Sequence, residues 1–119
     1  MTLRIFPANP EVWTIAPAGR LDLPASRAIE DALGDLCDAG NPRVVIDLTE
    51  VQYVASAGLK ALLKGLRRAR LQAGDVRLAA VNDRVREVFE MSGFDQVFTI
   101  YATTAGAVAS YLGATGATS

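Results

Sequence analysis

Residues 43–70 constrain the fold of this chain most strongly, because they predict a buried strand, a short turn and an amphipathic helix in direct succession. In the segment 43–48, Val44, Ile46 and Leu48 alternate with Val45 and Asp47, which is typical of a strand with two different faces. In the segment 57–71, leucines recur at the i, i+3, i+4 and i+7 positions of a helix. A strand followed directly by such a helix is the repeating unit of a parallel sheet.

The same alternation extends along the whole chain of 119 residues. Strands are predicted at 2–6, 11–16, 43–48, 76–81 and 97–101, and helices at 25–39, 57–71, 83–92 and 104–112. This order predicts an α/β fold with a mixed, mostly parallel sheet and crossover helices packed mainly on one face. The length fits one domain, which we place at 1–112, followed by a flexible C-terminal tail at 113–119.

Composition removes several classes of function. Twelve basic and 13 acidic side chains give a net charge of −1, which argues against a nucleic-acid binder. The apolar runs are too short to span a bilayer, so we expect no membrane insertion. Cys37 is the single cysteine, which favours a reducing, cytoplasmic setting. The chain has no histidine and no glycine-rich phosphate loop, so we expect neither an enzyme, nor a cofactor, nor a metal site.

Ser56 is the candidate functional residue, and the residues around it leave two uses open. A serine at the start of a helix commonly caps it by accepting a backbone N–H. A phosphate on the same hydroxyl would also be stabilised there, by unpaired N–H groups and the positive end of the helix dipole. Ala55, Ala57 and Gly58 are small, so a partner could approach the backbone closely.

Four segments together resemble STAS-domain proteins, the bacterial anti-sigma-factor antagonists. They are residues 46–59 (IDLTEVQYVASAGL), 19–22 (GRLD), 85–94 (VREVFEMSGF) and 97–101 (VFTIY). The resemblance implies a partner switch in which the unphosphorylated antagonist binds an anti-sigma factor that is also a serine kinase. The kinase phosphorylates the antagonist, and a phosphatase reverses the modification.

Matched by position, the resemblance makes Ser56 the phosphoacceptor. It also implies a partner-binding set around that residue, which comprises Asp22, Thr49, Ala55, Ala57, Gly58, Leu59 and Lys60. Asp22 is in addition placed to cap the helix predicted at 25–39.

Ala55 is a departure from the family, because many antagonists carry an acidic residue before the acceptor. It favours an alternative function as a non-enzymatic scaffold or accessory subunit of a sensory assembly or lipid-transport complex.

Nucleotide binding near Ser56 is a third hypothesis. On the basic face of the helix at 57–71 we expect Arg67 and Arg68 to be solvated, and Lys60 is the candidate for contact with an acidic partner or a nucleotide phosphate. The acidic face of the helix at 25–39 can pair with this face if the two helices are neighbours. The sequence leaves open whether the chain forms a homodimer.

Overall fold

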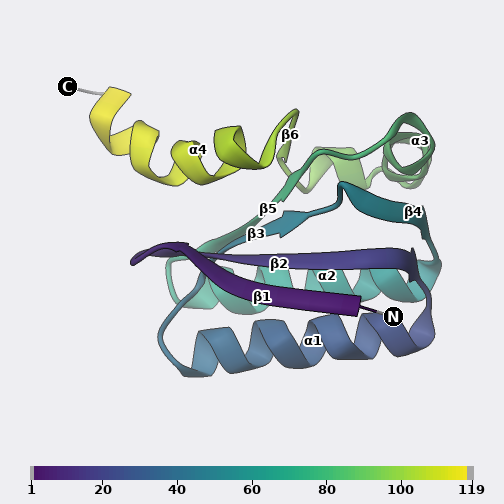
Figure 1. Ribbon diagram of the computed structural model, residues 1–119, viewed down its shortest axis with the longest axis horizontal. Coiled ribbons are helices and arrows are strands. Elements are labelled where there is room, and N and C mark those ends of the chain that lie inside the picture. Colours follow the sequence, from purple (N-terminus) through teal and green to yellow (C-terminus); the bar gives the residue numbers. More distant parts are fainter. Residues whose placement is uncertain (1, 118–119) are drawn as a thin grey trace.

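The structure is a computed structural model that describes residues 2–117. Over these residues the chain forms six strands, four α-helices and one short 3-10 helix, arranged as Figure 1 shows. In chain order these are β1 (Thr2–Asn9), β2 (Val12–Leu21), α1 (Leu23–Asp38), β3 (Arg43–Asp47), β4 (Glu50–Val54), α2 (Ser56–Leu71), β5 (Asp75–Ala79), α3 (Asp83–Ser92), η1 (Phe94–Gln96), β6 (Ile100–Tyr101) and α4 (Thr104–Ala117).

The strands form one sheet in the order β1-β2-β3-β5-β6, with β4 also paired to β2. Only β1 and β2 are antiparallel, joined by a turn in which the Asn9 side chain accepts the N–H groups of Glu11 and Val12 at 2.8 and 3.0 Å. The other strand pairs are parallel, so the predicted mixed and mostly parallel sheet is confirmed. β3 and β4 lie end to end along β2.

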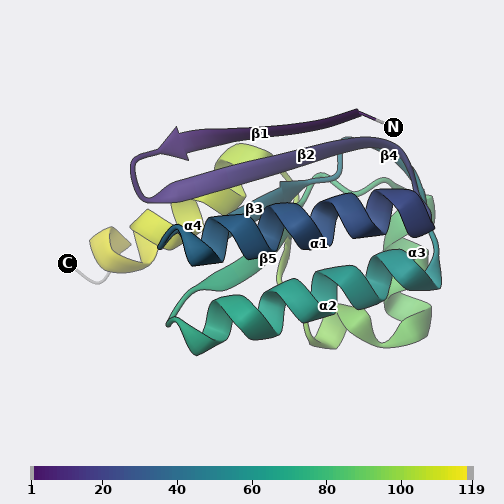
Figure 2. The ribbon, with the colours of Figure 1, turned by 90° about the horizontal axis from the view of Figure 1, so that it is seen from below.

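Helices cover the two faces of the sheet unequally. α1 and α2 lie side by side on one face, and α4 lies on the other (Figures 1 and 2). The larger core lies under α1 and α2 and takes in Val44 and Ile46, whereas Val45 packs with Tyr111 in a smaller core under α4. The predicted alternation of residues 43–48 and the placement of the crossover helices mainly on one face are therefore confirmed.

Ion pairs and a glycine join α1 to α2. Lys64 Nζ lies 2.9 Å from Glu30 Oε1, and Arg68 pairs with Asp38, so the helices are neighbours and their basic and acidic faces do pair. The expectation that Arg68 is simply solvated is wrong for this reason. Gly65 faces Leu33 so closely that a Cβ atom on it would lie 2.2 Å from Leu33 Cδ1. At this position the Leu33 side chain packs directly against the backbone of α2, and there is no room for a side chain on residue 65.

The structure differs from the prediction in several elements. β1 and β2 run to Asn9 and Leu21, beyond their predicted ends at residues 6 and 16. β4 occupies a segment that the sequence predicts as a turn. The strand predicted at 97–101 is shortened to β6, because residues 97–99 form a turn after η1. The backbone of α4 is helical to Ala117, beyond the predicted end at residue 112, so the flexibility of 113–119 stays a prediction, and 118–119 lie outside the described residues. No helix within 2–117 has the length and apolar character needed to cross a membrane.

Candidate functional site

Ser56 is exposed and is the first residue of α2. The N-cap position belongs to Ala55, whose carbonyl accepts the N–H groups of Gly58 at 2.9 Å and Leu59 at 3.2 Å. No side chain caps this helix end. The interpretation of Ser56 as an N-cap is therefore wrong, because the hydroxyl lies one residue too far along the chain to fill that role.

Gly58 sets how closely α2 begins against β2. A Cβ atom on Gly58 would lie 2.9 Å from the Leu21 carbonyl oxygen and 3.0 Å from Leu21 Cβ, so a larger residue would push the two elements apart. The same Leu21 carbonyl accepts the Ala55 N–H at 3.0 Å. Gly58 and Leu59 are both buried and pack inward at the start of α2, next to Ser56, and the partner contacts expected of them stay a prediction.

Asp22 lies at the same end of the molecule as Ser56, since it directly follows Leu21. Its carboxylate accepts the Ala25 N–H at 3.3 Å, so the predicted capping of α1 is confirmed. Figure 2 shows that α1 and α2 begin side by side at this end. Asp22 is half-buried, which leaves part of its surface open beside the start of α2.

Thr49 lies away from Ser56, at the far end of β4. Its N–H donates to the Asp47 carboxylate at 3.0 Å, and its hydroxyl donates to the same oxygen. The five residues of β4 separate Thr49 from the start of α2 by roughly 15 Å. The expectation that Thr49 lies beside the helix start is wrong, because it treats residues 49–55 as a compact turn. Ala57, half-buried, and Lys60, exposed, do stay near Ser56 on α2.

Two residues that the sequence analysis does not single out also lie near Ser56. Arg20 pairs with Tyr53 at the end of the β2–β4 ladder, and the Arg20 guanidinium carbon lies 4.4 Å from the centre of the Tyr53 ring. The sequence feature that could have predicted this irregular strand is the spacing of Val51 and Val54. Residues three apart face opposite sides of a regular strand, so burial of both valines requires an extra residue between them.

Perturbed titrating groups lie elsewhere in the described part of the chain. Burial raises the pKa of the Cys37 thiol near the end of α1 and that of the Tyr111 hydroxyl in α4. Within 2–117, no three His, Cys, Asp or Glu side chains gather as a metal site would require. What the start of α2 offers chemically is an accessible hydroxyl with small neighbours.

Comparisons with known proteins agree on one family. The sequence matches the family model described as STAS domain over residues 5–107. It is 36% identical over 83 residues to BtrV, a Bordetella bronchiseptica protein named as an anti-sigma factor antagonist, covering 70% of this chain and 72% of the relative.

Solved structures show the same fold. An anti-sigma factor antagonist from Mycobacterium paratuberculosis superimposes with a TM-score of 0.81 at 26% identity, covering 92% of each chain. The Bacillus cell fate determinant SpoIIAA in its phosphorylated form superimposes with a TM-score of 0.73 at 21% identity, covering 90% of this chain and 96% of that one.

Proposed function

Since the chain belongs to the STAS domain family, we propose that it acts as an anti-sigma factor antagonist in the cytoplasm. In its unphosphorylated form it binds an anti-sigma factor that is also a serine kinase, through the surface at the start of α2. Phosphorylation of Ser56 ends this binding, and a phosphatase restores it. The chain is thus a substrate and a binding partner, and not an enzyme.

The exposure of Ser56 at the first position of α2 is the observation that carries this proposal. A kinase can reach a hydroxyl that points into solvent, whereas a hydroxyl bound into a helix cap would have to be released first. The 36% identity to BtrV supports the antagonist role, and the existence of a phosphorylated form of SpoIIAA, a protein of this fold, is consistent with regulation by phosphate.

A phosphate at this position would change the surface without unfolding the helix. It would add about −1.5 to −2 charges at a helix N-terminus, where backbone N–H groups and the helix dipole favour negative charge. Ala55 carries no side-chain oxygen that would compete with the phosphate for the first-turn N–H groups. A partner that fits closely against Ala55, Ser56 and Ala57 would then meet both bulk and charge.

The phosphorylation step is tested with the purified anti-sigma factor kinase encoded in the same genome and Mg-ATP. Intact-mass spectrometry should show one added phosphate on the wild-type chain and none on Ser56→Ala. Ser92→Ala is the matched control, because Ser92 is also an exposed serine at a helix end, and it should accept the phosphate as the wild type does. Phosphate on Ser56→Ala, or none on the wild type, would contradict the proposal.

A further inference from the structure

A β-bulge shapes the surface next to the start of α2. In the β2–β4 ladder, Gly19 pairs with Val51 and Arg20 pairs with Tyr53, so Gln52 is an extra residue in β4. Bulges of this kind re-aim the side chains that follow them. Gln52 and Tyr53 are both exposed, and Tyr53 comes to lie beside Arg20.

The Arg20–Tyr53 pair forms a fixed cationic platform. The guanidinium carbon lies 4.4 Å from the ring centre, so one face of the guanidinium is covered by the ring, and Tyr53 retains 39% of its exposure. Within the part of the chain that the structure describes, no carboxylate forms an ion pair with Arg20. Stacking thus orients the guanidinium while leaving its N–H donors for another molecule.

The Arg20–Tyr53 platform lies at the same end of the sheet as the start of α2. Leu21 and Val54, the next residues of the two strands, are paired and face the core, so Arg20 and Tyr53 point to the opposite face of the sheet. One step further, the Leu21 carbonyl accepts the Ala55 N–H at 3.0 Å, and Ser56 follows. A protein seated over Ser56 would therefore reach this platform.

We infer that the Arg20–Tyr53 platform is a second anchor for the anti-sigma factor and receives a carboxylate from it. This inference rests on the proposed function. Arg and Tyr are enriched among the residues that dominate binding at protein interfaces, and a stacked guanidinium binds a carboxylate through two parallel N–H···O bonds. Tyr53 acts as a positioning residue for Arg20, because its ring keeps the guanidinium in one orientation before the partner arrives.

Calorimetric titration of the anti-sigma factor kinase, loaded with ADP so that no phosphate is transferred, tests this inference. Arg20→Ala and Tyr53→Ala should each weaken binding about tenfold or more. Arg20→Lys should lose most of the affinity, because an ammonium cannot bind a carboxylate in the bidentate manner. Tyr53→Phe, which keeps the ring, should bind within about twofold of the wild type.

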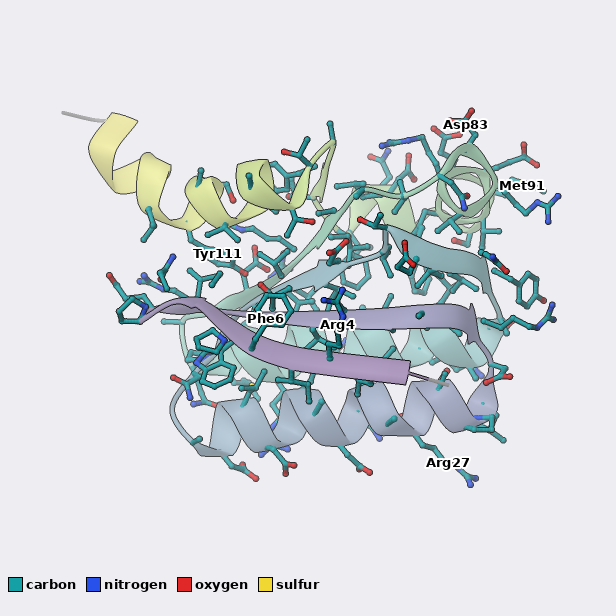
Figure 3. The ribbon with its side chains drawn as sticks, viewed as in Figure 1. Arg4, Phe6, Arg27, Asp83, Met91 and Tyr111 are labelled. Atoms are coloured by element: carbon teal, nitrogen blue, oxygen red, sulfur yellow. The ribbon has the colours of Figure 1, made fainter. Side chains whose placement is uncertain are left out.

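The matched control is Arg4→Ala. Arg4 also lies over an aromatic ring, with its guanidinium carbon 5.8 Å from the centre of Phe6, and both residues are exposed on β1 (Figure 3). β1 and α2 lie on opposite sides of the molecule (Figure 2). Its replacement should leave the affinity unchanged. Thermal unfolding of each variant confirms that a loss of binding is not a loss of fold.

Ser56→Asp in the same titration separates the two proposals. If Ser56→Asp weakens binding but Arg20→Ala does not, the second anchor is refuted and the phosphorylation switch stands. If Arg20→Ala weakens binding but Ser56→Asp does not, the platform binds the partner and the switch is refuted. Wild-type affinity in both variants would overturn both proposals.

Discussion

At the scale of single residues, Tyr111 fastens the last helix to the sheet. Its side chain extends from α4 toward the strands, and its hydroxyl lies 2.9 Å from the Val44 carbonyl and 2.6 Å from the Asp75 carbonyl (Figure 3). The Arg77 guanidinium carbon lies 3.9 Å from the ring centre. Burial, and secondarily the charge of Asp75, raise the pKa of the Tyr111 hydroxyl above its ordinary value.

Because the folded state keeps Tyr111 protonated more strongly than the unfolded state does, we predict a loss of stability at alkaline pH. The contribution is fully present below pH ~10, the ordinary tyrosine pKa, and is lost as pH rises toward the higher folded-state pKa. Urea unfolding between pH 7 and 11 should show this decline in the wild type and a smaller one in Tyr111→Phe. At pH 7 the variant should be about 1–3 kcal/mol less stable, because it loses the hydrogen bonding of the hydroxyl to the Val44 and Asp75 carbonyls.

Tyr53→Phe serves as the control variant, because it removes a tyrosine hydroxyl from an exposed side chain. An equally steep decline in Tyr111→Phe would contradict the assignment.

The exact role of Ser56 shows where prediction from the sequence stops at this scale. Small residues around the hydroxyl indicate a helix start, and the structure confirms that α2 begins there. The N-cap and the first helical position are one residue apart, and Ser is a far better N-cap residue than Ala, so propensity favours Ser56 as the cap although the structure places Ala55 there. Asp22 was easier to predict, because it is a strong N-cap residue placed just before an apolar helical pattern.

At the scale of elements, two glycines at the α1–α2 interface should respond to alanine in opposite directions. A Cβ atom on Gly65 would lie 2.2 Å from Leu33 Cδ1, whereas one on Gly34 would meet only the end of the Arg68 side chain, at 3.3 Å. We expect Gly65→Ala to lower the free energy of unfolding by about 1–3 kcal/mol through overpacking. Gly34→Ala should raise it by up to ~1 kcal/mol, because alanine favours the helix.

Urea unfolding of the two variants beside the wild type checks this prediction. Ion pairs between α1 and α2 are exposed and contribute little, so the sign depends on packing. A change of the same sign in both variants would show that the helices do not approach as the structure describes.

β4 is the element that the sequence does not predict, and the bulge is the reason. A strand is recognised by alternation of buried and exposed residues, and the extra residue Gln52 breaks this pattern after one repeat. With β4 taken as a turn, Thr49 and Ser56 are expected to lie close together. The same bulge brings Arg20 and Tyr53 together, so one irregularity accounts for both a misplaced residue and a missed pair.

At the scale of the whole molecule, alternation of strands and helices was sufficient to predict the fold class. Right-handed crossovers place the connecting helices mainly on one face, which the structure confirms. The crossover rule does not predict the position of α4, because it applies to a helix between two strands and no strand follows α4 in the described chain. α4 instead covers apolar residues on the second face, including Val45 and Ala79. Its position depends on packing across the finished sheet, which local patterns do not report.

The starts of α1 and α2 and the β2–β4 ladder meet at one end of the molecule. A phosphate on Ser56 at this end should weaken partner binding without altering the fold. We therefore predict that the phosphorylated chain has the same far-UV circular dichroism and thermal unfolding midpoint as the unphosphorylated chain.

The most direct test of the central claim is the dissociation constant of the anti-sigma factor kinase for the two forms of the wild-type chain. The account predicts that phosphorylation of Ser56 weakens binding by roughly 30-fold or more, which corresponds to ~2 kcal/mol. Equal affinity of the two forms, within about twofold, would contradict it.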